Sequence, residues 1–81
     1  MEENLELFTE WLKKHTRHKA ELYDGWNSKR SIDEFMRFAV EELGEVSSAV
    51  TRERWELAMA ECIDLAHCAF LIFDKIKQES Q

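Results

Sequence analysis

The feature that most limits how this chain can fold is its shortage of helix-breaking residues. Its 81 residues contain no proline and only two glycines, of which Gly25 falls in an expected loop. Proline and glycine are the residues that most strongly interrupt helices. So few of them over this length predict a few long helices rather than many short strands. A chain this short suffices for one domain, so we expect residues 1–81 to form a single all-α domain.

Apolar side chains at helical spacing predict three helices, at residues 5–23, 31–50 and 55–76. The second helix opens with Ser31 and Glu34, which match the capping box, in which each side chain accepts a hydrogen bond from the other's backbone amide. A turn is expected at residues 51–54, with Thr51 as a candidate N-cap for the third helix. The second and third helices are then expected to pair as an antiparallel hairpin.

The third predicted helix is apolar around nearly its whole circumference. From Leu57 to Phe73 its only strongly polar residues are Glu61, Asp64 and His67. This pattern is typical of a helix buried on every side. Two other helices of this length cannot cover it, so we expect these antiparallel three-helix units to associate, as a homodimer or tetramer, into a larger bundle. The expected contact residues are Phe70, Leu71 or Phe73, and a monomer with an exposed apolar patch is the alternative.

Charge and composition limit the kinds of partner that the protein can bind and the cellular compartment in which we expect it. The formal net charge is −6, with 17 acidic and 11 basic side chains, which argues against nucleic-acid binding. The longest strongly apolar run, Cys68 to Phe73, is far shorter than the roughly 20 residues of a membrane span. No leader of basic and then apolar residues opens the chain. Cys62 and Cys68 suit neither a mutual disulfide nor a zinc knuckle, so we expect reduced thiols and a cytoplasmic protein.

Two pairs of acidic residues are the candidate site. Glu42 and Glu45 are three residues apart, as are Glu61 and Asp64, so each pair lies on one helix face. Both midpoints are equally distant from residue 53, which puts the pairs level in a hairpin, about 14 Å from the turn. Burying four carboxylates together is unfavourable without a cation, and hard oxygen ligands favour Mg²⁺ or Mn²⁺. Solvated or salt-bridged acids are the alternative, with candidate partners Arg37, Arg52 and Arg54.

The segment Glu41-Glu42-Leu43-Gly44-Glu45, followed after fifteen residues by Glu61-Cys62-Ile63-Asp64, resembles a known signature. It is similar to the EExxE…ExxD motif of the MazG-type all-α nucleoside triphosphate pyrophosphohydrolases, which include dimeric dUTPases and dCTP pyrophosphatases. The resemblance covers residues 32–76. It implies that Glu42, Glu45, Glu61 and Asp64 hold Mg²⁺, with Glu41 either supporting catalysis or on the surface. It also implies hydrolysis of an NTP or dNTP to the monophosphate and pyrophosphate.

Several other residues are weaker candidates. Trp26 lies in the first expected loop, where related dCTP pyrophosphatases carry an aromatic residue, so it either stacks on the base or caps the core. Three basic residues near this loop are expected either to contact phosphates or to be solvated: Arg17, His18 and Lys29. Gly44, between two ligands, predicts a close approach of another helix.

Two rival hypotheses are open. Asp64 and His67 match the acid-x-x-His step of carboxylate-bridged di-iron bundles. However, Glu61 and His67 diverge by about 120° around the helix, so we expect His67 at a helix contact instead. The other rival is a non-enzymatic helical adaptor that uses the apolar third helix to bind a partner chain. It explains the apolar surface but not the two level acidic pairs.

Overall fold

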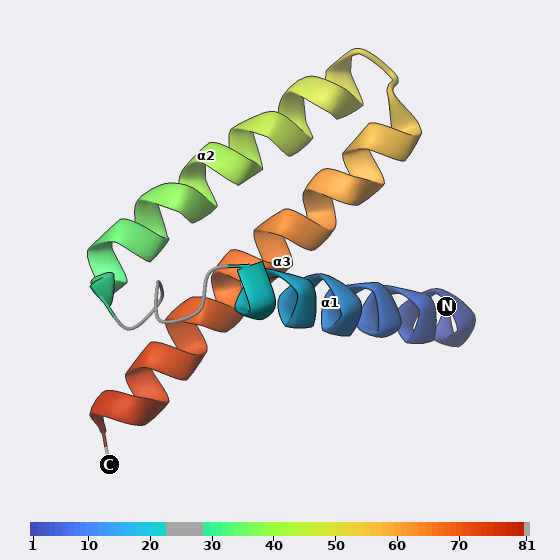
Figure 1. Ribbon diagram of the computed structural model, residues 1–81. Coiled ribbons are helices and arrows are strands. Elements are labelled where there is room, and N and C mark those ends of the chain that lie inside the picture. The colour runs from blue at the N-terminus through green and yellow to red at the C-terminus, as the bar shows by residue number, and fades with distance from the viewer. Residues whose placement is uncertain (23–28, 81) are drawn as a thin grey trace.

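The computed structural model describes residues 1–22 and 29–80, and these form three α-helices (Figure 1). Helix α1 spans Glu2–Leu22, α2 spans Ile32–Thr51 and α3 spans Trp55–Glu79. The all-α prediction is confirmed, although α1 begins three residues earlier and α3 ends three residues later than expected. Within the described part of the chain, no helix is both long enough and apolar enough to cross a lipid bilayer.

Helices α2 and α3 lie side by side as an antiparallel hairpin, and α1 crosses α3 at a large angle (Figure 1). The capping box predicted at the start of α2 is confirmed. The Glu34 amide donates to Ser31 Oγ at 3.2 Å, and the Ser31 amide donates to Glu34 Oε1 at 3.3 Å. Such a cap is worth about 1 kcal/mol, and it fixes where α2 begins.

The turn between α2 and α3 is only three residues long, Arg52 to Arg54. The Arg52 amide donates to the Ser48 carbonyl at 3.1 Å, and the Arg54 amide donates to the Ala49 carbonyl at 2.9 Å. Glu53 has a φ of 57°, in the left-handed region, which lets the chain reverse. These bonds satisfy carbonyl groups at the end of α2 that would otherwise lack partners.

The N-cap predicted at Thr51 is wrong. Thr51 is the last residue of α2, and the N-cap of α3 is Arg54, which makes no side-chain capping hydrogen bond. Helix α2 therefore extends one residue further than the spacing of its apolar residues predicted.

The core lies along the hairpin. Phe35 of α2 is 1% exposed, and no side chain between residues 1 and 21 of α1 is buried. The other buried residues in the described part of the chain are Ala49, Ala58, Ile63, His67, Cys68 and Leu71. Leu71 therefore packs within its own chain, whereas Phe70 and Phe73 are exposed. A single chain consequently does not bury α3 on every side.

The exposed large apolar residues of α2, and those of α3 other than Leu57, form a stripe along each helix. On α3 these residues are Trp55, Met59, Phe70, Phe73 and Ile76, and on α2 they are Met36, Val40, Leu43 and Val50. At about 100° per residue, the α3 stripe is centred roughly opposite the face that bears Asp64 and His67. Because α2 and α3 are antiparallel, the same arithmetic puts both stripes on one face of the hairpin, away from α1.

The predicted close approach at Gly44 is wrong for a single chain. Gly44 is exposed, and a Cβ built on it would meet nothing within 4 Å. The glycine is therefore not required by packing between the helices of one chain.

Candidate metal centre

Three carboxyl groups from the two hairpin helices meet on the turn side of the hairpin's middle. Glu42 and Glu45 of α2 and Glu61 of α3 each offer one oxygen, and these oxygens lie within 4.8 Å of one another. Glu42 and Glu61 are half-buried and Glu45 is exposed. The i, i+3 spacing on α2 and the antiparallel register of α3 produce this group, which we call the carboxylate cluster.

Two oxygens of the carboxylate cluster lack partners. Glu42 Oε2 and Glu61 Oε2 are buried and accept no hydrogen bond from any described residue. Burial, together with the neighbouring carboxyl groups of Glu61 and Glu45, raises the pKa of Glu42 to about 8. Burial and the Glu45 carboxyl also raise the pKa of Glu61. Both shifts favour the protonated form of the cluster, and a divalent cation would favour the ionised form instead.

Asp64, the fourth predicted ligand, is not part of this cluster. Its Oδ1 lies 3.1 Å from Nε2 of His15 on α1. Asp64 lies one turn along α3 from Glu61, on the side that α1 covers, and its shorter side chain meets α1 there. It remains near enough for its negative charge to raise the pKa of both Glu42 and Glu61.

A small polar contact fixes α1 against α3 beside Asp64. The His15 and His67 rings meet edge to face with their centroids 5.0 Å apart. Thr16 Oγ1 lies 3.1 Å from Nδ1 of the buried His67. Burial lowers the pKa of His67 to about 4, so this ring is neutral at physiological pH. His67 lies at a helix contact, as expected, rather than facing the carboxylate cluster.

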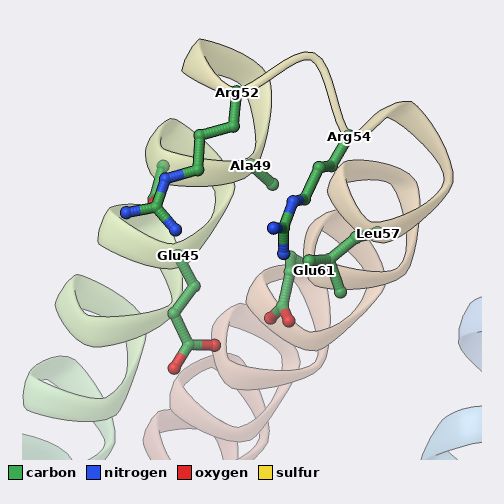
Figure 2. Close-up of a pocket in the computed structure, with 7 residues that line it drawn as sticks. Glu45, Ala49, Arg52, Arg54, Leu57 and Glu61 are labelled. Carbon is green, nitrogen blue, oxygen red and sulfur yellow. The ribbon is translucent and has the colours of Figure 1, made fainter.

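A pocket of about 160 Å³, which we call the turn pocket, lies between the carboxylate cluster and the α2–α3 turn. Its lining residues are Glu45, Ser48, Ala49, Arg52, Arg54, Leu57 and Glu61 (Figure 2). The Arg52 and Arg54 side chains extend from the turn towards the two glutamates (Figure 2). Among residues 1–22 and 29–80, neither arginine makes an ion pair within 4.0 Å.

From the sequence, Arg52 and Arg54 were predicted only as candidate salt-bridge partners of the acids. Their position at the turn that joins the two ligand-bearing helices is the sequence feature from which their place in the pocket could have been predicted.

A wider groove of about 440 Å³ lies between α1 and α3. Its lining residues are Trp11, Lys14, His15, Glu56, Ala60, Ile63 and Asp64. Glu61 lines the turn pocket and Asp64 lines this α1–α3 groove, so these two acidic residues of α3 border different concave surfaces.

The remaining predicted site residues lie elsewhere. Glu41 is exposed on α2 and outside the carboxylate cluster. Arg17 and His18 on α1 and Lys29 ahead of α2 are exposed, and none of them lines the turn pocket or the groove. Trp26 falls at 23–28, outside the described residues.

Comparisons of the chain with protein-family models, with curated proteins and with solved structures found no match. Any functional proposal therefore depends on the residues of the site itself.

Proposed function

We propose that this protein is a Mg²⁺-dependent nucleoside triphosphate pyrophosphohydrolase, which converts an NTP or dNTP and water to the monophosphate and pyrophosphate. The observation that carries the proposal is the pair of buried oxygens, Glu42 Oε2 and Glu61 Oε2, that have no hydrogen-bond partner among the described residues. An unpaired buried polar group is costly. A hard divalent cation would supply the missing partner.

The donor set fits Mg²⁺ or Mn²⁺ rather than a softer metal. All three members of the carboxylate cluster are carboxyl groups, which hard cations prefer. Burial and the nearby Glu42 charge raise the pKa of Cys68 to about 11, so this thiol stays protonated and is a poor ligand. Glu42, Glu45 and Glu61 would hold the ion, and Asp64 would add negative charge beside them. When bound, Mg²⁺ offsets phosphate charge and acidifies water at the site.

The resemblance of residues 41–64 to the MazG-type signature supports the same assignment. Three of its four ligand positions contribute to the carboxylate cluster. Glu41 is exposed, so we assign it no contact with the ion.

The proposal includes a second copy of the chain on the exposed face of the hairpin. Two helices, each about 10 Å wide and about 30 Å long, present a face of about 600 Å². Each partner in a standard protein interface buries about 800 Å². The face that bears the two apolar stripes therefore offers about three quarters of the area that each partner in a standard interface buries.

A helical adaptor is the second candidate, and the exposed stripes are the observation that favours it. An adaptor accounts for the apolar face, but it gives no reason for three carboxyl groups to converge within 4.8 Å of one another. The enzymatic proposal accounts for both features.

The deciding experiment is a screen of standard and modified nucleoside triphosphates with Mg²⁺, scored for pyrophosphate and monophosphate. We expect release of both products from at least one triphosphate and complete loss of release when EDTA is added. The matched control is Glu61→Gln, which keeps the side-chain shape and removes the charge. Absence of pyrophosphate release from every triphosphate with both Mg²⁺ and Mn²⁺ would favour the adaptor.

A further inference from the structure

We infer that the turn pocket binds the terminal phosphates of the triphosphate, with Arg52 and Arg54 as the residues that hold them. This inference rests on the proposed function, because it assigns the phosphates and the nucleoside of that substrate to two different parts of the site. Arg54 points from the turn towards Glu61 and Arg52 extends along α2 on the side of Glu45 (Figure 2). All four side chains line the turn pocket, so cationic and anionic groups share one small pocket.

The charges in the turn pocket are complementary to a metal–phosphate complex. Arg52 and Arg54 make no ion pair with a described carboxylate, although Glu45 and Glu61 line the same pocket. A divalent cation would neutralise the carboxylates, which leaves the arginines to neutralise phosphate oxygens. Guanidinium groups bind phosphates through paired hydrogen bonds. A chain with a net charge of −6 needs such local positive charge to attract a polyanion.

The size of the turn pocket determines which end of the substrate it takes. Its volume of about 160 Å³ is below the roughly 300–1,000 Å³ of pockets that hold whole small molecules. It has room for about five waters at ~30 Å³ each, which suits phosphoryl groups and excludes a nucleoside. The turn also closes this end of the hairpin. Among the described residues, the α1–α3 groove of about 440 Å³, beside Asp64, is a concave surface with room for the nucleoside.

The backbone that carries the arginines is held in place. The Arg52 and Arg54 amides donate to carbonyl groups of the last turns of α2, at 3.1 and 2.9 Å. Only three residues join the helices, so the guanidinium groups start from a fixed frame. Less ordering is then required when phosphate binds.

The test is calorimetric titration of inorganic pyrophosphate, with MgCl₂ present, into the full chain and its variants. Arg52→Gln and Arg54→Gln should each weaken pyrophosphate binding at least about tenfold, the effect of losing a charged hydrogen bond. Arg54→Lys keeps the charge but not the paired geometry, so its binding should be intermediate. Arg37→Gln on exposed α2 surface is the matched control and should bind as the wild type does. Unchanged melting temperatures will show that each variant is folded.

The outcomes separate this inference from the proposed function. If the double Arg52→Gln, Arg54→Gln variant binds pyrophosphate like the wild type, the turn pocket is not the phosphate site, even if triphosphates are hydrolysed. If the wild type does not bind pyrophosphate at all, the inference also fails. If pyrophosphate binds through both arginines but no triphosphate is hydrolysed, the anion site stands and the proposed reaction fails.

Discussion

Glu42 is a residue whose environment disfavours its charged form. Its pKa rises from the ordinary value of 4.5 to about 8 in the fold, mainly because it is buried beside other carboxyl groups. The unfolded chain therefore releases this proton at a lower pH than the folded chain. The resulting contribution to stability is lost as pH rises from about 4.5 to about 8.

This shift predicts how the melting temperature depends on pH. In metal-free buffer, the wild type should lose stability relative to Glu42→Gln between about pH 4.5 and 8, because only the wild type carries the Glu42 carboxyl group, which ionises in this range. Thermal melts of both proteins across this range provide the measurement. Mg²⁺ should reduce the difference between their slopes, since it favours the ionised carboxylate. Parallel pH profiles for the two proteins would contradict the shift.

The carboxylate cluster also predicts the effect of removing single charges. Glu42→Gln, Glu45→Gln and Glu61→Gln should each lower turnover by about 100-fold, as loss of a main electrostatic stabiliser does. The metal-free variants should melt at the same or a higher temperature, because repulsion between carboxylates is relieved. Steady-state pyrophosphate release and thermal melts measure the two effects. Glu41→Gln, on exposed surface, is the control, and lower stability with unchanged turnover would indicate structural salt bridges instead.

For single residues, the sequence predicted the positions that depend only on helical periodicity. The three-residue spacing of Glu42 and Glu45, and the distance of Glu61 from the turn, were enough to predict that they meet. The contact of Asp64 with His15 was not predictable, because it depends on the angle at which α1 crosses α3. Side-chain periodicity carries no information on that angle.

Among the elements, α2 carries one avoidable weakness. Gly44 lies inside the helix, and an added Cβ would meet nothing within 4 Å. Gly44→Ala should therefore raise the free energy of unfolding by about 1 kcal/mol, the difference in helix propensity. Urea denaturation monitored by circular dichroism measures this change. A loss of stability would show that another chain approaches the helix closely at this position.

The elements were predictable in number, type and order because each helix has its own apolar period and start signal. Ser31 and Glu34 predicted the beginning of α2 through local chemistry alone. The end of α2 was predicted less well, since Thr51 fits both a helix terminus and an N-cap. Backbone hydrogen bonds from the turn to the Ser48 and Ala49 carbonyl groups make Thr51 the last residue of α2. Side-chain patterns do not encode these hydrogen bonds.

For the whole molecule, the exposed stripes predict association. Phe73, 63% exposed on α3, and Met59, 50% exposed, lie on the same apolar face. We expect the wild type to sediment as at least a dimer of the 9.7 kDa chain at micromolar concentration. Phe73→Glu should give a folded monomer, because a charge at the contact is costly to bury, whereas this position is exposed in the single chain.

Phe8→Glu, on the exposed part of α1, is the matched control and should leave the assembly intact. Sedimentation equilibrium distinguishes the cases. A monomeric wild type would contradict the association. Dissociation by Phe8→Glu but not by Phe73→Glu would indicate that the interface lies on α1.

The three-residue turn between α2 and α3 also shapes the path by which the chain folds. Contacts across this hairpin are local in sequence and need little loop-closure entropy, so they are expected to form early, before α1 docks. We therefore expect Glu42, Glu45 and Glu61 to approach one another in the folding transition state. Their repulsion should slow refolding more than it speeds unfolding. Divalent cations would then accelerate refolding, with little effect on the unfolding limb of a chevron plot.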